Sequence, residues 1–187
     1  LALTSQLDLF DNGFSERLLE YDRNIYRFTE EINFKRKKPI VWKYFQYLSL
    51  LFTEMYLDEY FRDRELLQNK LNKTLDSLRS TEQLGTEIPN YTIDNLNKIA
   101  LWQATGSGKT LLMHMNILSL QHHMNKNERG HHFNKILLIT PNEGLSEQHL
   151  QEFQDSNIPA RRFDDGAQLN LLTSGSDSII EVLEITK

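Results

Sequence analysis

Residues 104 to 110 read Ala-Thr-Gly-Ser-Gly-Lys-Thr, and this stretch decides the predicted fold. An apolar run over residues 99–102 precedes it, and a second apolar run begins at Leu111. A strand, a glycine-rich turn and a helix in this order form the context that a phosphate-binding loop requires. Glycines let main-chain N–H groups turn around phosphate oxygens, and the start of a helix adds partial positive charge. The sequence therefore predicts a site for a nucleoside triphosphate.

The residues of this loop have separate predicted roles. Lys109 would reach the outer phosphates, and the Thr110 hydroxyl would help to hold Mg²⁺. These two are the candidate catalytic residues, and Thr110 is the candidate metal ligand, so we expect a nucleoside triphosphate and Mg²⁺ as cofactors; the family resemblance described below implies that the nucleotide is ATP. The other candidate nucleotide-binding residues of the loop are Thr105, Gly106, Ser107 and Gly108. The full motif has a further glycine where this chain has Gln103. The alternative interpretation is a glycine–serine turn before a basic helix start.

Composition and charge limit the class of protein. With 187 residues, 39% hydrophobic and 25% charged, the chain is typical of a folded protein with one good-sized core. The net charge of −5 means that any contact with nucleic acid must be local or supplied by sequence outside these residues. The chain has no cysteine, which excludes disulfides and thiolate metal sites. No run approaches the ~18 apolar residues of a membrane span, and the first residues lack a secretory n-region. We therefore expect a cytoplasmic protein with no membrane partner.

Residues 1–90 are predicted to form a helical N-terminal region. A helix from about Val41 to Phe61 has apolar residues three and four apart, which predicts its buried face, beside a polar stripe. The apolar positions are Phe45, Leu48, Phe52 and Met55, and the polar ones are Gln46, Ser49 and Thr53. A second run of helical spacing extends from Phe10 to Ile25, with a break at residues 11–13, and a third from Leu67 to Leu78.

Residues 91–187 are predicted to alternate between strand and helix. The expected strands are 99–102, 136–139, 160–163 and 179–185, and the expected helices are 110–123 and 144–153. The run 136–139 is apolar without interruption, which predicts burial on both faces of a parallel sheet. Alternation of this kind implies right-handed βαβ units with a ligand at the carboxyl ends of the strands. The predicted class is therefore α/β, with a parallel sheet covered by helices on both faces.

A second motif follows the strand at 136–139, where Thr140-Pro141-Asn142 precedes a helix. Together with the loop at 104–110, it resembles the superfamily 2 helicases and translocases, most closely the motor subunits of type I and type III restriction enzymes. The resemblance implies the first part of a P-loop RecA-like lobe at 91–187, translocation on duplex DNA, and other subunits of a restriction–modification complex as partners. It makes Thr140, Pro141, Asn142 and Gln148 candidate DNA-contact residues, and free N–H groups at a helix start suit phosphate on general grounds. The alternative is ordinary turn chemistry.

Lys43-Tyr44-Phe45-Gln46 resembles the basic-x-x-Gln element of this family, whose glutamine amide pairs with both edges of adenine. The resemblance makes Gln46 a candidate nucleotide-binding residue and residues 40–61 the adenine side of the lobe. Two departures are the lysine in place of arginine and the long distance to the loop. The alternative is a solvent-facing glutamine on an amphipathic helix.

Hydrolysis needs a strand ending in Asp-Glu that holds Mg²⁺ and orients water, and no convincing example follows Thr140. Asp164-Asp165 lacks a preceding apolar strand, and Asp58-Glu59 lies within helical periodicity, which predicts a solvated helix face. The second lobe and arginine fingers of the family are also absent. The chain begins at Leu1 and ends just after an apolar run. We therefore expect an N-terminal fragment that binds ATP–Mg²⁺ but does not hydrolyse it.

Other features favour structural interpretations. A polar loop is flanked by His122, His123, His131 and His132, and paired imidazoles could ligate zinc or nickel. Because no Cys or carboxylate accompanies them in register, these histidines are predicted to lie in a plain exposed loop. His114 and His149 lie on predicted helices without a catalytic partner, and the basic run 35–38 is predicted to be a solvated turn, with DNA contact as its alternative. Two functional alternatives stay open: an RNA helicase of the same superfamily, and a P-loop switch or assembly module.

Overall fold

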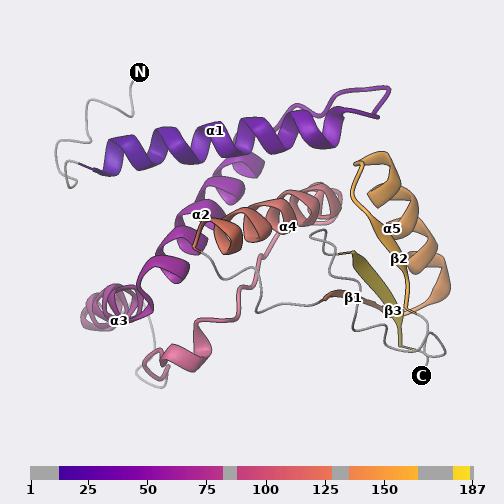
Figure 1. The fold of residues 1–187 in the computed structure, drawn as a ribbon. Helices are drawn as coiled ribbons and strands as arrows, with labels where there is room; N and C mark the ends of the chain where they lie inside the picture. The colour runs from indigo at the N-terminus through magenta and orange to yellow at the C-terminus, as the bar shows by residue number, and fades with distance from the viewer. Residues whose placement is uncertain (1–12, 82–87, 128–134, 164–178, 186–187) are drawn as a thin grey trace.

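The computed structural model describes residues 13–81, 88–127, 135–163 and 179–185. Within these ranges, five α-helices accompany one small sheet (Figure 1). The helices are α1 (Phe14–Asn33), α2 (Tyr44–Arg62), α3 (Arg64–Ser80), α4 (Lys109–Lys126) and α5 (Glu143–Asp155), with a short 3-10 turn η2 (Ile93–Asn95). The strands are β1 (Ile136–Thr140), β2 (Ala160–Arg162) and β3 (Ile180–Glu184). The mixture of helices with a sheet agrees with the predicted class.

The three strands form a parallel sheet in the order β1-β3-β2. Ile180 at the start of β3 lies opposite Ile136 of β1 and Ala160 of β2. Helix α5 connects β1 to β2 and packs against all three strands. A parallel pair requires such a crossover connection, because the chain must return to the same end of the sheet. The predicted parallel arrangement is confirmed for these strands.

Local sequence explains where the helices begin. The Asp63 side chain, in the single residue between α2 and α3, accepts a hydrogen bond from the N–H of Leu66. The Asn142 side chain accepts one from the N–H of Leu145 at the start of α5. Asp and Asn are favoured at this position because their oxygens satisfy N–H groups that have no intrahelical acceptor. Helix α1 begins at Phe14, directly after Gly13, whereas residues 11 and 12 of the predicted break lie outside the described residues.

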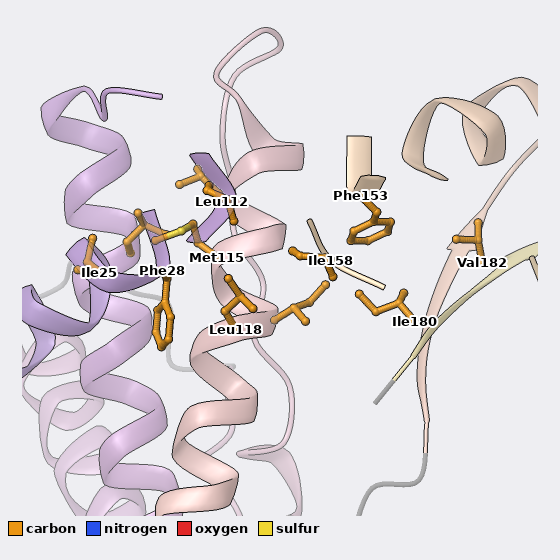
Figure 2. Packing of buried hydrophobic residues seen from close by; sticks show 12 residues of the cluster. Ile25, Phe28, Leu112, Met115, Leu118, Phe153, Ile158, Ile180 and Val182 are labelled. Carbon is orange, nitrogen blue, oxygen red and sulfur yellow. The ribbon is translucent and has the colours of Figure 1, made fainter. Parts of the chain in front are cut away.

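The buried core is continuous from the N-terminal helices to the sheet (Figure 2). Its members come from α1, α2, α4, α5, the loop after α5 and β3: Ile25, Phe28, Ile32, Leu50, Leu112, Met115, Ile117, Leu118, Phe153, Ile158, Ile180 and Val182. Figure 2 shows the α4 residues between those of α1 on one side and those of the sheet on the other. Helix α4 therefore joins the helical half of the chain to the α/β half.

The predicted strand at 99–102 is wrong, because these residues form neither strand nor helix. Trp102 is 100% exposed, and Ile99 and Leu101 are also exposed. A strand needs a neighbour for its main-chain N–H and C=O groups. The sheet built by the described residues offers no such partner to this segment.

Strand β1 is buried on one face only, so the predicted burial on both faces is wrong for the described part of the chain. Leu137 is 48% and Ile139 56% exposed, whereas Ile136 and Leu138 pack against the core. Successive residues of a strand point to opposite faces. Among the described residues, α5 and α4 supply one apolar layer, and the face that carries Leu137 and Ile139 lies open.

Helix α2 buries a different face from the predicted one. Phe45, Leu48 and Phe52 are exposed, whereas Leu50, Thr53, Glu54, Leu57, Asp58 and Phe61 are buried. The buried side of α2 faces α1 and α4, where polar groups of those helices bind Glu54 and Asp58. Polar partners from distant parts of the chain thus override the hydrophobic pattern.

Candidate phosphate-binding site

The glycine-rich loop leads directly into helix α4. Gly108 is the residue before the helix, with φ of 85°, and Gly106 has φ of 73°. Both values lie in the left-handed region, which glycine adopts without the steric cost that other residues incur. A Cβ atom on Gly108 would also lie 2.7 Å from Nε2 of Gln46. The positive φ therefore favours glycine at 108, and a Cβ atom there would displace the amide end of the Gln46 side chain.

Hydrogen bonds inside the loop hold its shape. The Ser107 N–H donates to the Ala104 carbonyl over 3.3 Å, and the Ser107 hydroxyl donates to Oε1 of Gln103 over 3.0 Å. The Lys109 ammonium donates to the carbonyl oxygens of Gln103 at 3.3 Å and Ala104 at 3.1 Å. Gln103, which departs from the motif, thus closes the loop through its side chain. Sequence reasoning missed this role, and no local pattern signals it.

Gln46 lies against the loop although 61 positions separate it from Ser107. Its Nε2 donates to the Ser107 carbonyl over 2.7 Å, and its Oε1 accepts from the Lys43 N–H over 2.9 Å. In this arrangement both polar groups of the amide have protein partners. The structure thus brings Gln46 to the predicted nucleotide site, where its amide holds the loop.

The segment predicted to contact DNA surrounds the start of α5. Thr140 is 2% exposed, and its hydroxyl lies 2.6 Å from that of Ser146. The Thr140 side chain is therefore occupied inside the protein. Pro141, Asn142 and Gln148 are exposed. The first N–H groups of a helix have no intrahelical acceptor. An anion can therefore bind at this end of α5 only through N–H groups that the Asn142 side chain does not already occupy.

The structure does not bring this segment to the glycine-rich loop. The Nδ1 atom of His114, in the second turn of α4, lies 2.8 Å from the Ser156 hydroxyl at the C-terminal end of α5. Thr140 and Asn142 adjoin the other end of α5, whose 13 residues span about 20 Å. The predicted position of the loop at the carboxyl ends of the strands is thus wrong, because residues 99–102 form no strand that would carry it there.

Two of the predicted exposed histidines are not exposed. His123 is 0% exposed and His122 is half-buried on α4, whereas His131 and His132 lie outside the described residues. The sequence held a signal for His123, because it follows Met115 and Ser119 at intervals of four on one helix face. Within the described ranges, no group of three or more His, Cys, Asp or Glu could hold a metal ion.

Two charged motifs also differ from expectation. Asp58 is 2% exposed, so the predicted solvated face is wrong for this residue, whereas Glu59 forms a surface ion pair with Lys70. In the basic run, Arg36 is not a solvated side chain. It lies 3.2 Å from Glu152 and donates to the Ser156 hydroxyl over 2.7 Å, which ties the loop after α1 to α5. Asp164-Asp165 lies outside the described residues.

A groove in the described structure lies away from the loop. It encloses about 520 Å³ between α5, β2 and the loop after α1, and its lining includes Lys35, Gln151, Arg161 and Arg162. No residue of 104–110 lines it. The loop is instead an open surface feature, with exposed residues at 104–106 and at Lys109.

These features define a mixed α/β protein with a glycine-rich loop at a helix start. The family model of the type III restriction enzyme res subunit matches residues 61–180, well over half of the chain. The chain therefore belongs to this family of helicase-like, ATP-dependent subunits of restriction enzymes. Comparisons with curated proteins and with solved structures gave no match. Across the described residues, no helix has the length and apolarity to cross a lipid bilayer.

Proposed function

We propose that this chain is the ATP-binding part of the first motor lobe of an ATP-dependent DNA translocase in a restriction–modification enzyme. The loop at 104–110 carries the proposal, because two glycines with positive φ lead into the first turn of α4. Such a loop directs main-chain N–H groups and the positive end of the helix toward one point. The family is ATP-dependent and typically uses Mg²⁺, which agrees with this chemistry.

The residues of the loop fit a magnesium nucleotide. Lys109 carries the cation of the loop, and its ammonium already lies over the loop carbonyls of Gln103 and Ala104. On nucleotide binding, this ammonium would exchange the two carbonyl oxygens for phosphate oxygens, and Thr110 would provide its hydroxyl to Mg²⁺. Bound MgATP supplies the phosphoanhydride bond whose hydrolysis drives a motor. The chain itself binds and orients the phosphates through residues 105–110.

We further propose that residues 1–187 bind ATP without hydrolysing it. Hydrolysis requires an acidic element that orients Mg²⁺ and water, and the sequence after Thr140 offers no strand that ends in Asp-Glu. Measurable ATPase activity of the purified chain would contradict this part of the proposal.

The proposed nucleic-acid partner is duplex DNA, in a cytoplasmic complex with other restriction–modification subunits. Exposed Pro141, Asn142 and Gln148 at the start of α5 are the proposed contacts. Because such contacts are to phosphates, binding should weaken linearly in a plot of log affinity against log salt. Matched DNA and RNA duplexes, titrated at several salt concentrations, distinguish a DNA motor from an RNA helicase.

The decisive experiment is the ATP-induced thermal shift of Lys109→Ala. A ligand at 100 times its dissociation constant stabilises the folded state by about 2.7 kcal/mol, which corresponds to roughly 5 to 10 °C for a chain of this size. We expect this shift for the wild type and its loss in Lys109→Ala. Lys98→Ala is the matched control, because Lys98 is exposed outside the loop. An unchanged shift in Lys109→Ala would refute the assigned site.

A further inference from the structure

Ser107, in the middle of the glycine-rich loop, has a protein partner for each of its polar groups. Its N–H donates to the Ala104 carbonyl over 3.3 Å, and its hydroxyl donates to Oε1 of Gln103 over 3.0 Å. Its carbonyl oxygen accepts from Nε2 of Gln46 over 2.7 Å. Ser107 is therefore the residue through which the loop is fixed, both to the residues just before it and to α2.

Two of these groups are donors of the kind that phosphate oxygens bind. The Ser107 carbonyl can only accept, so its contact with Gln46 removes no donor of the loop. The N–H and the hydroxyl of Ser107 can both donate, and both are directed at residues 103 and 104. The Lys109 ammonium donates to the main-chain oxygens of the same two residues. The loop thus binds three of its own donors that a polyphosphate would use.

The Gln103 side chain is the part of this arrangement that depends on residue type. Any residues at 103 and 104 would present the main-chain oxygens that Lys109 and the Ser107 N–H bind. The acceptor of the Ser107 hydroxyl is a side-chain amide oxygen, at the position where the full motif has a glycine. Gln103 and Ser107 are both half-buried, which shields their hydrogen bond from competing water. This contact is therefore a property of this sequence and not of the motif.

The contact with Gln103 closes a turn that phosphate binding must open. The turn runs from Ala104 to Ser107, and its third residue, Gly106, has φ of 73°, as a type II turn requires at that position. The Ser107 N–H closes the turn by its bond to Ala104 and can meet a phosphate oxygen only after it leaves that carbonyl. Because the hydroxyl belongs to the same residue, this movement also takes Ser107 away from Gln103.

We propose that Gln103 lowers the affinity of the loop for nucleotide, because its amide oxygen competes with phosphate oxygens for Ser107. This role rests on the proposed function and deepens it, since it assigns a residue that sets the affinity of the same site. Binding exchanges the bond between Ser107 and Gln103 for bonds from Ser107 to phosphate, so the free energy of the first bond is subtracted from the free energy of binding. Gln103 acts through Ser107 and is a positioning residue.

The test is the Kd for MgATP of Gln103→Met, measured by calorimetry on the full chain. Methionine is of similar length, and its thioether is only a weak acceptor. We expect Kd to fall about fivefold, because the net value of one hydrogen bond corresponds to about that factor in an equilibrium constant. Gln154→Met, the same change at an exposed position of α5, is the matched control and should leave Kd unchanged. A Kd in Gln103→Met that equals or exceeds the wild-type value would overturn the proposal.

A second background ties the effect to Ser107. Ser107→Ala removes the donor of the same hydrogen bond, so Gln103→Met in that background should leave Kd nearly unchanged, as expected for two residues in direct contact. A merely structural role of Gln103 would give a different pattern, because loss of a supporting contact weakens binding in both backgrounds. An equal tightening in both backgrounds would overturn the route through Ser107. Gln103→Ala removes the same acceptor and replaces the methionine variant if that variant does not fold.

Inorganic tripolyphosphate with Mg²⁺ separates the phosphates from the rest of the nucleotide. Because the competition concerns phosphate oxygens, Gln103→Met should lower the Kd for this probe by the same factor as for MgATP. Tightening for MgATP alone would contradict competition with phosphate. If neither the wild type nor Gln103→Met binds either ligand, the proposed function fails. If the wild type binds and Gln103→Met binds no more tightly, the role of Gln103 fails and the assigned site stands.

Discussion

Nε2 of Gln46 lies 2.7 Å from the main-chain oxygen of Ser107, and the amide donates a hydrogen bond to it. The other end of the same amide accepts from the Lys43 N–H at the start of α2. One side chain thus joins the beginning of α2 to the loop from which α4 begins. If the loop moves on ligand binding, either the hydrogen bond between Gln46 and Ser107 breaks or the Gln46 side chain moves with the loop.

Replacement of Gln46 by alanine should destabilise the protein by about 1 kcal/mol, the usual net value of one intramolecular hydrogen bond. For a chain of this size, this corresponds to a fall in Tm of roughly 2 to 4 °C. Urea unfolding measures the change. Gln148→Ala is the control, because Gln148 is an exposed glutamine on a helix. Equal stability of Gln46→Ala and the wild type would mean that the bond to Ser107 contributes nothing.

The two glycines of the loop should differ in their tolerance of alanine. At Gly106 an added Cβ meets open space, so Gly106→Ala should cost only the backbone strain of the left-handed conformation, about 1 to 2 kcal/mol. Gly108→Ala incurs the same backbone strain, and its added Cβ would also lie only 2.7 Å from Nε2 of Gln46. Gly108→Ala should therefore be the more destabilising of the two in urea unfolding.

A double-mutant cycle isolates the clash at Gly108 from the strain. In the background of Gln46→Ala, the atom that the Cβ would meet is gone, so Gly108→Ala should cost about as much as Gly106→Ala. Coupling between Gln46 and Gly108 should be at least 0.5 kcal/mol, as for residues in direct contact. Additive effects at these two positions would contradict the observed proximity.

The loop itself could be predicted from sequence, but its surroundings could not. The motif at 104–110 and the start of α4 depend on neighbouring residues, whose glycines and helical spacing are visible in the sequence. Strand 99–102 failed because a strand depends on a partner, and no local pattern reports whether one is present. The apolar run in β1 correctly predicted a strand but not the exposure of Leu137 and Ile139, which depends on the layers that cover the sheet.

Distant polar pairing explains the errors at α2 and in the basic run. From sequence, Glu54 and Asp58 resemble surface residues of an amphipathic helix. In the structure, Asn24, Ser119 and His123 of other helices bind Glu54, and the Tyr21 hydroxyl donates to Asp58. From sequence, Arg36 resembles a solvated basic residue, but in the structure it forms an ion pair with Glu152 of α5. Hydrophobic periodicity records which residues avoid water, and it carries no information on which polar residues find each other.

Arg36→Ala should destabilise the protein by about 2 kcal/mol, because hydrogen bonds that involve a charged group are worth about 1.5 to 3 kcal/mol. The change removes the ion pair with Glu152 and the donor to the Ser156 hydroxyl, which is itself buried. Lys37→Ala, in the same loop and exposed, should stay within ±0.5 kcal/mol of the wild type. Chemical denaturation of both variants provides the comparison, and similar losses in the two would contradict a specific role for Arg36.

His114 should make the protein less stable as the pH falls below neutrality. Burial, with smaller contributions from the charges of Arg36 and His149, lowers the pKa of His114 from its ordinary 6.5 to about 4. Between these values the unfolded chain binds a proton that the folded protein excludes. The stability that His114 contributes is therefore complete above pH 6.5 and is lost as the pH falls toward 4.

The variant His114→Asn separates this effect from other titrations. Asparagine can still hydrogen-bond to the Ser156 hydroxyl, which lies 2.8 Å from Nδ1 in the wild type, but it does not titrate. Between pH 7 and pH 5, the wild type should lose about 2 kcal/mol more unfolding free energy than the variant, from the linkage of one proton. Urea unfolding at the two pH values measures this difference. Because His149 is partly exposed, the control His149→Asn should change the pH dependence of stability less than His114→Asn does. Equal pH dependence in the wild type and His114→Asn would show that the buried imidazole takes up its proton as readily as it does in the unfolded chain.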